Sequence, residues 1–426
     1  MRIPSRRALT ILARAYVLGI AAIVATPSVL AFCGFYVAKA DGKLSNKSSQ
    51  IIIARDGNRS NITMVSDYQG NFKDFAMVVP VPSVLQKNQI RVLDSSVVSK
   101  LDAYSVPRLV EYFDEDPCVQ MRLEELVKPS SAPTATGAAD SERDKALGVT
   151  VEAQYTIGEY DIVILSATQS DGLETWLLEN GYKIPTGARA ALEPYIKGGM
   201  KFFVAKVNLE NFAKSGATLL RPLQMSFETP MFMLPLRLGM LNAVGDQDLV
   251  VYALTRKGRV ETVNYPNVKV PSDAEVPLFV KNEFGKMYAA LFKRAYEREN
   301  KKAAFLEYAW NTSNCDPCSS DPPTMEQLER AGAGWVGQNP NTFLTRIHIR
   351  YNKRNFKEDL MFRETNSQET FQARYILRHD WKGEASCDEA KSYKAELPKR
   401  LETQAQNLAR LTGWKIEDIR RKAGIR

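Results

Sequence analysis

Two of the five cysteines have the Cys-x-x-Cys spacing found in thiol–disulfide oxidoreductases. These are Cys315 and Cys318, with a proline before the second cysteine. Such enzymes place the first cysteine at a helix N-terminus, where the helix dipole stabilises the thiolate. Here a double proline at 322–323 delays the next helix to near Thr324, which can form a capping box with Gln327. The motif therefore favours a structural disulfide, with a redox enzyme as the alternative.

The other cysteines are Cys33, Cys118 and Cys387. In an oxidising compartment, five cysteines predict two disulfides and one odd thiol. The pairing stays open: the Cys-x-x-Cys pair can close on itself or send one bridge to Cys118 or Cys387. Cys33 is expected to tie the mature N-terminus to the core.

A row of cationic side chains is the second candidate site. Arg346, His348 and Arg350 alternate along a predicted strand at 344–351, so they share one face about 6–7 Å apart. Such a row could contact an anionic ligand or an acidic partner. The alternative is a solvated face paired with acids of the next strand, such as Glu358 or Asp359.

Other chemistries find little support in the residues. The chain has two histidines, and neither belongs to a spaced ligand pair, so no metal is predicted. A G-x-G-x-x-G match at 332–337 follows a helix instead of a strand, so Gly332 is expected to end that helix. We therefore predict no catalytic residue and no cofactor.

The net charge of +8 is unevenly distributed along the sequence. Four arginines lie before position 32, and residues 388–426 hold ten Lys/Arg against six Asp/Glu, so the part between them is neutral. A neutral main part argues against nucleic acid as a partner. The basic tail also carries apolar residues, which predicts either weak contact with a membrane surface or a packed terminal helical hairpin.

The first 31 residues have the layout of a secretory signal peptide. Arg2, Arg6 and Arg7 precede an apolar run at 16–25, and small residues at Val29 and Ala31 suit cleavage near Ala31. The run is shorter than the ~20 residues that cross a bilayer. The sequence thus predicts a secreted or periplasmic protein, with a retained anchor or a lipid on Cys33 as alternatives.

Hydrophobic patterning predicts an α+β fold that is β-rich, with mainly antiparallel sheets, short helices on one side and a helical C-terminal tail. Strands are expected at 50–54, 61–65, 75–79, 149–155, 160–165, 202–207, 223–227, 232–236, 249–254, 305–310 and 344–351. Helices are expected around 92–109 and at 171–178, 188–196, 281–302 and 397–421. An apolar run that ends in proline occurs twice, at 75–80 and 232–235.

The sequence divides into five parts by composition. They are a signal peptide (1–31), an N-terminal β-rich part (32–128), a flexible linker or loop (129–148), a second α+β part (149–387) and a basic helical tail (388–426). The linker contains Pro, Ser, Ala, Thr and charged residues, which bury too little surface to order a segment.

An ordered set of short motifs resembles a known family. The motifs are DYQG (67–70), DFAMVVPVP (74–82), LETWL (173–177), NGY (180–182), RPL (221–223), PLRL (235–238), CDPC (315–318) and LTRIHIRY (344–351). They resemble the bacterial secreted family called domain of unknown function 2330, over roughly 33–362. The resemblance implies an exported protein and assigns no activity or site residue. We therefore expect a non-enzymatic binding or structural role, with a periplasmic thiol–disulfide oxidoreductase as the alternative.

Overall fold

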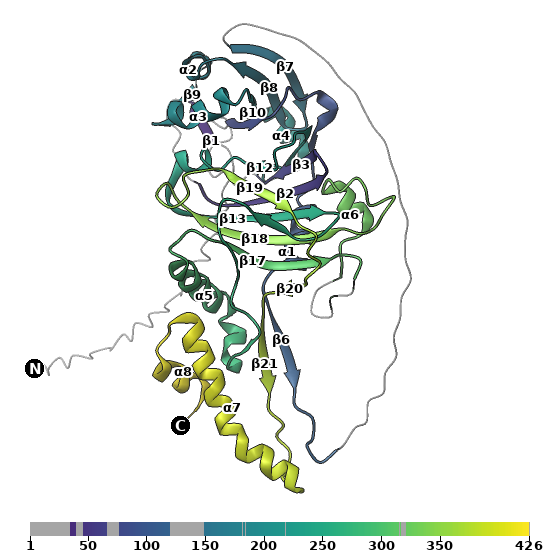
Figure 1. Cartoon of the computed structure of the whole chain (residues 1–426), viewed down its shortest axis with the longest axis vertical. Helices are drawn as coiled ribbons and strands as arrows, with labels where there is room; N and C mark the ends of the chain where they lie inside the picture. Colours follow the sequence, from purple (N-terminus) through teal and green to yellow (C-terminus); the bar gives the residue numbers. More distant parts are fainter. Residues whose placement is uncertain are drawn as a thin grey trace, which may run out of the picture.

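Two large β-sheets pack face to face, and a narrow arm extends from one end of them (Figure 1). The structure is a computed structural model that describes residues 35–39, 46–65, 76–119, 149–180, 182–183, 185–217, 219–314, 316 and 321–425. The leader, Cys33, the 129–148 linker, Cys315 and Cys318 lie outside these residues, so the predictions about them remain predictions.

The first large sheet has six strands joined by antiparallel pairs. In spatial order they are β7 (Val149–Ile157), β8 (Tyr160–Ala167), β10 (Lys201–Val207), β4 (Ala76–Val81), β1 (Phe35–Lys39) and β9 (Tyr182–Lys183). Helices α2 (Ser170–Glu179) and α3 (Ala188–Lys197) cover its outer face, where Leu173 and Leu192 are fully buried.

The second large sheet has nine strands. They are β15 (Asn267–Lys269), β17 (Ala304–Asn311), β18 (Phe343–Tyr351), β13 (Ala243–Thr255), β2 (Asn46–Asp56), β3 (Arg59–Met64), β11 (Leu223–Glu228) and β5 (Ile90–Val92), with β20 (Phe371–Gln372) beside β17. The pairs β13–β2 and β15–β17 are parallel, and the other pairs are antiparallel. Strands from before and after the predicted linker therefore share both large sheets.

The main core lies between the two sheets. Alternate residues of each strand point into it, such as Val79 and Phe203 from the first sheet and Ile53, Val251 and Ile347 from the second. All of these side chains are almost completely buried. This dry interface is the main source of hydrophobic stabilisation.

Three helices cover the outer face of the second sheet: α1 (Ser96–Ser105), α5 (Phe284–Arg298) and α6 (Met325–Arg330). The predicted capping box is confirmed, because the Thr324 hydroxyl accepts from Gln327 N and the Gln327 side chain accepts from Thr324 N. Gly332 follows α6 with a φ of 105°, as expected of a residue that ends a helix. A Cβ on Gly332 would lie 2.5 Å from the Cβ of Asn61, so only glycine fits.

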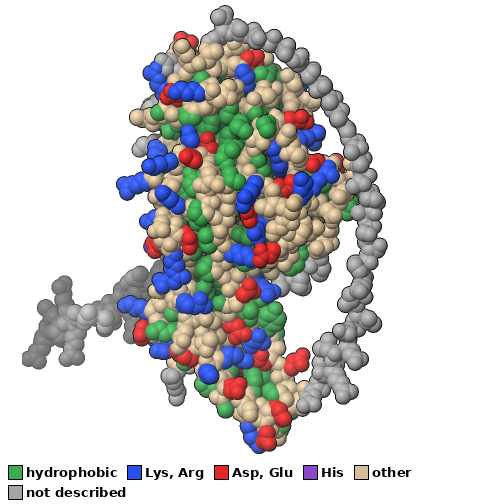
Figure 2. Space-filling model, viewed as in Figure 1, with side chains coloured by type: hydrophobic (Ala, Val, Ile, Leu, Met, Phe, Trp, Pro, Cys, Tyr) green, Lys and Arg blue, Asp and Glu red, His purple; other side chains and the backbone are tan. Residues whose placement is uncertain are grey.

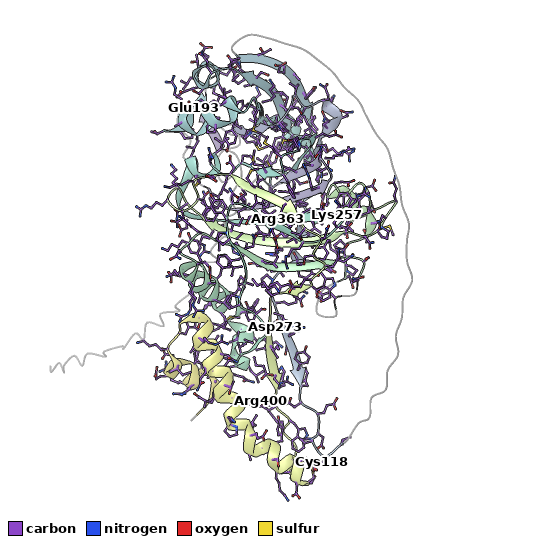
Figure 3. All side chains as sticks on the ribbon, viewed as in Figure 1. Cys118, Glu193, Lys257, Asp273, Arg363 and Arg400 are labelled. Carbon is purple, nitrogen blue, oxygen red and sulfur yellow. A yellow bond between two sulfur atoms is a disulfide. The ribbon has the colours of Figure 1, made fainter. Side chains whose placement is uncertain are left out.

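The arm is built around a three-stranded parallel sheet of β16 (Ala274–Glu275), β21 (Arg374–His379) and β6 (Arg108–Phe113). Helices α7 (Asp388–Thr412) and α8 (Ile416–Ala423) pack on it together with α5 and the 3-10 turn η4 (Leu278–Asn282). We define the body as all described elements outside the arm, except that α5 contacts both. Figure 3 shows Cys118 near the tip of the arm and Arg400 on α7, whereas Glu193, Lys257 and Arg363 lie in the body.

The remaining elements are short. They are α4 (Leu209–Ser215), the turns η2 (Lys87–Gln89) and η3 (Gly239–Asn242), and a small sheet of β12 (Met233–Leu234), β19 (Leu360–Glu364) and β14 (Val260–Thr262).

Most of the predicted elements are present, and the α+β, mainly antiparallel fold class is confirmed. Several details were wrong. Helices were expected on one side, but they cover the outer faces of both large sheets. The helix expected around 92–109 covers only Ser96–Ser105, because residues 90–92 and 108–113 pair as the strands β5 and β6. The strand predicted to stop before Pro80 continues to Val81, and Pro80 pairs with Phe202 of β10. On its other edge, β4 pairs with β1 only at residues 76–78. Among the described strands, Pro80 therefore has no partner on that edge, and its missing N–H costs no hydrogen bond there. The 232–236 run forms only the two-residue strand β12.

The packed-hairpin interpretation of the tail is confirmed. Leu408, Leu411 and Ile419 are buried against α5 and the arm sheet, so the apolar side of the tail is covered by the protein itself. Figure 2 shows basic and acidic side chains interspersed over the visible face, with no single-sign field.

Candidate functional site

The predicted row of Arg346, His348 and Arg350 lies on β18, under α1 and α5. It is largely buried, because Arg346 is only 6% exposed and the His348 ring stacks on Phe292 of α5 at a centroid distance of 3.8 Å. The row therefore lies on the helix-covered outer face of the second sheet and is not a solvated surface.

Carboxylates from neighbouring elements alternate with these cations. The Nε of Arg346 donates to Glu307 over 2.6 Å, and its Nη1 donates to Asp102 of α1 over 2.6 Å. His348 lies between Glu307, at 2.8 Å from Nδ1, and Asp248, at 3.1 Å from Nε2.

Arg350 completes the set with two hydrogen bonds, of 2.7 and 2.9 Å, to the carboxylate of Asp248. We name this set of six residues the charge ladder: Asp102, Arg346, Glu307, His348, Asp248 and Arg350.

Glu307 reaches the ladder because of a β-bulge. Leu306 pairs with Ile347 and Tyr308 pairs with Arg346, so Glu307 is an extra residue with no partner on β18. A bulge re-aims a side chain and locally disrupts the strand ladder. The Glu307 carboxylate thereby meets both cations and also accepts from the Tyr288 hydroxyl of α5.

Burial and pairing set the protonation states of the ladder. Burial lowers the pKa of the His348 imidazole, but Glu307 and Asp248 outweigh this and raise it from 6.5 to about 9. Burial raises the pKa of Glu307, but His348 and Arg346 outweigh it and bring the value to about 2. The same balance, with His348 and Arg350, lowers the pKa of Asp248 to about 2. The carboxylates of Glu307 and Asp248 and the imidazole of His348 are thus charged at neutral pH.

An ionised ladder with matched partners is a structural ion-pair network. His348 is held as a cation between two carboxylates, which is unsuitable for a general base. The carboxylates expected to pair with the row were wrong: Asp359 instead accepts from Tyr195 and the Leu236 amide, because β19 pairs with β12 and β14 and not with β18. Contact of the row with an anionic ligand stays a prediction.

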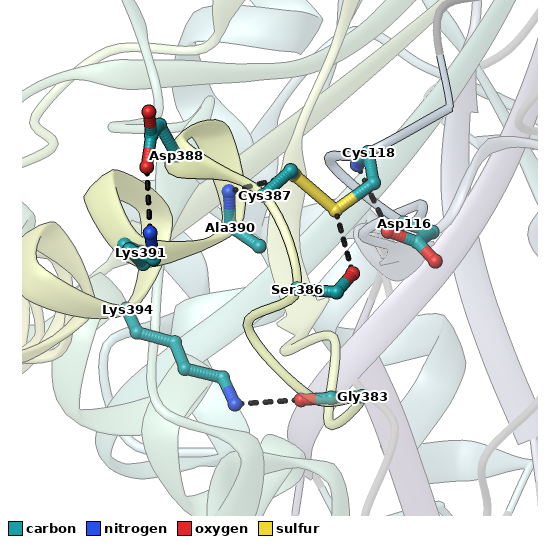
Figure 4. Close-up of a disulfide and its surroundings, with 9 residues drawn as sticks. All are labelled: Asp116, Cys118, Gly383, Ser386, Cys387, Asp388, Ala390, Lys391 and Lys394. Atoms are coloured by element: carbon teal, nitrogen blue, oxygen red, sulfur yellow. Dashed lines mark hydrogen bonds and ion pairs between the residues drawn. A yellow bond between two sulfur atoms is a disulfide. The ribbon is translucent and has the colours of Figure 1, made fainter.

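The described cysteines form one disulfide, between Cys118 and Cys387, with Cα atoms 5.9 Å apart (Figure 4). The Cys387 sulfur also accepts from the Ala390 amide and so caps α7. This pairing rules out a bridge from Cys315 or Cys318 to either residue.

Asp316, between the two cysteines of the motif, accepts from Tyr308 and Gln372 at 3.0 Å each. This aspartate therefore contacts the second sheet at β17 and β20.

A cavity of about 350 Å³ lies on the outer face of the first sheet, beside α2. Its floor comes from β7, β8 and β10, and the Trp176 indole of α2 forms one wall. Asp161 and Lys206 are direct cross-strand partners in this floor, and Gln154 and Asn180 add amide groups. The Asp161 carboxylate is oriented by Thr156, at 2.8 Å, and by Asn208.

Sequence reasoning missed this cavity. The residues that line it belong to strands and a helix that the sequence predicts. A single polar residue within a predicted strand, however, indicates only that the side chain points outward, and it does not indicate a binding site. The available signal was the pair of charged residues, Asp161 and Lys206, inside two mainly apolar strands.

Within the described residues, no group of three or more His, Cys, Asp or Glu side chains is placed to hold a metal ion. No described helix has the length and apolar character needed to cross a membrane. Searches among curated proteins and among solved structures gave no match. A family model does match residues 27–363, and the chain therefore belongs to DUF2330, a family of uncharacterized proteins conserved in bacteria.

Proposed function

We propose that this protein is a non-enzymatic binding protein that holds a small polar ligand in the cavity beside α2. The cavity carries the proposal, since its volume of about 350 Å³ lies in the range of small-molecule sites. Most of its polar groups project from paired strands, which hold a binding geometry better than loops do.

The lining suggests the chemistry of the ligand. Asp161 and Lys206 offer opposite charges side by side, and Trp176 offers an apolar surface. A ligand of no net charge, with donors, acceptors and one apolar face, would match all three. A monosaccharide and a zwitterionic amino acid share this chemistry.

The disulfide is typical of proteins outside the cytoplasm. Together with the predicted signal peptide, it supports a secreted or periplasmic location. The thiol–disulfide alternative gains less support, because α6 begins only at Met325 and no described helix starts directly after Cys318.

Titration calorimetry of the mature protein with panels of monosaccharides and amino acids tests the proposal. We expect one panel to contain a ligand, and Lys206→Met or Asp161→Asn to weaken its binding at least tenfold. Glu193→Gln is the matched control, because Glu193 is an exposed residue of α3 that forms a salt bridge with Lys197 and does not line the cavity. Binding that survives both cavity variants, or no binding in either panel, would contradict the proposal.

A further inference from the structure

A second, very different crevice lies between the two large sheets. It forms where the ends of β3, β4 and β11 meet the loop before β12. The two proline-ended runs of the sequence come together here, since Pro80 and Pro235 both line the crevice.

Methionine thioethers dominate the wall of this crevice. Five of the twelve methionines in the chain line it: Met64, Met200, Met225, Met231 and Met233. They come from β3, the residue before β10, β11, the loop and β12.

Strand register brings two of these methionines together. Met64 lies opposite Leu223, and Met225 lies opposite Ile62, so the two methionines are diagonal neighbours on one face. Long side chains can meet at that spacing.

The size and charge of the crevice restrict its occupant. Its free volume is about 20 Å³, which holds about one water molecule and no organic ligand. Among the residues that the structure describes, no Asp, Glu, His or Cys lines it. Zinc, calcium and magnesium prefer anionic or imidazole ligands, whereas neutral thioethers suit the soft ion Cu(I).

The loop that carries Met231 is held in place by hydrogen bonds to its backbone. Arg55 donates to the carbonyl oxygens of Thr229, at 2.9 Å, and Pro230, at 3.4 Å. The Met231 amide donates to the Thr229 hydroxyl. Met231 itself is 43% exposed, whereas Met64 and Met225 are almost fully buried, so it forms the entrance.

We propose that this crevice is a binding site for a single Cu(I) ion, with Met64, Met225, Met231 and Met233 as candidate thioether ligands. The site is separate from the cavity beside α2, and we infer it from different observations.

The test is competition for Cu(I) with a chromogenic chelator under reducing conditions, after alkylation of free thiols. We expect one Cu(I) per chain and an X-ray absorption spectrum with sulfur ligands. The paired substitutions Met225→Leu and Met231→Leu should weaken binding at least tenfold. Leucine nearly conserves the volume of methionine, so the protein with the paired substitutions should fold.

Two controls separate the site from methionine content in general. Met287→Leu alters a buried methionine of α5, and Met325→Leu alters an exposed one of α6, so neither should change Cu(I) binding. The proposal is overturned if the alkylated protein does not compete for Cu(I), or if the paired variant binds it as tightly as the parent.

Discussion

The body and the arm of this molecule are held together by different means. The body buries a dry core between two large sheets, and its polar groups on the outer face of the second sheet form the charge ladder. The arm has a small parallel sheet with one helix-covered face, and it adds a disulfide and a group of ion pairs around Arg400, Asp114 and Asp380.

The difference follows from size. A small sheet with one helix-covered face buries less apolar surface than two large packed sheets do, so covalent and ionic links contribute more in the arm. The family match ends at 363, before β21 and α7, and the arm thus joins β6 and β16 of the family region to a C-terminal segment beyond it. The comparison predicts that damage to the ladder weakens the body, whereas loss of the disulfide loosens only the arm.

The largest effect is expected from Glu307→Ala. It leaves Arg346 and His348 buried without their shared carboxylate, so we expect a loss of about 3–5 kcal/mol in the free energy of unfolding. Urea denaturation measures this loss. Glu210→Ala is the control, because that exposed carboxylate pairs only along α4 and should change stability by less than about 0.5 kcal/mol. Equal effects for the two variants would mean that the ladder does not stabilise the body.

The second effect is a dependence on pH. The folded pKa of His348 is raised to about 9, so its contribution is complete below the ordinary value of 6.5 and is lost as the pH rises through 9. We expect a decrease of about 3 kcal/mol over this window. Urea denaturation at a series of pH values should show it, and His348→Gln should abolish it. A parent protein with constant stability from pH 6.5 to 9 would refute a charged His348.

The third effect concerns the arm. Cys118→Ser with Cys387→Ser should cost about 2 kcal/mol in the local unfolding of the arm. This cost is at the low end for a disulfide, because the folded body keeps the two ends of the opened segment close together when only the arm unfolds. Hydrogen exchange should become faster in α7 and β21 and stay unchanged in β13 and β18. Faster exchange throughout both large sheets would show that body and arm unfold as one unit.

The smallest effect is local to one helix of the body. Thr324→Ala removes the cap of α6 and should cost about 1 kcal/mol, measured by thermal unfolding. Ser95→Ala is the control, since the side chain of Ser95 makes no capping bond to α1. A larger loss from Ser95→Ala than from Thr324→Ala would contradict the capping assignment.

Local features of the fold could be predicted from the sequence. The hairpin of β2 and β3, the cap at Thr324 and the apolar side of the tail depend on neighbouring residues, and the structure contains each of them. The parallel pairing of β6 with β21 joins strands far apart in the sequence, and no local pattern encodes it.

The candidate sites were harder to predict, for the same reason. Arg346, His348 and Arg350 could be placed on one face of a strand, but their partner Glu307 arrives through a bulge, and Asp102 comes from a helix that precedes the strand by more than two hundred residues. The cavity beside α2 likewise combines three strands and a helix. Such sites depend on register and packing, which a single sequence does not reveal.

The disulfide also has a topological consequence. Cys118 and Cys387 are separated by 269 positions, so the bridge closes residues 118–387 into a covalent ring. The segments before Cys118 and after Cys387 are linear chains attached to this ring. One cut of the backbone anywhere between Cys118 and Cys387 opens the ring without releasing a fragment. A nicked molecule would keep the mass of the intact chain, apart from one added water, and would separate into two pieces only after reduction.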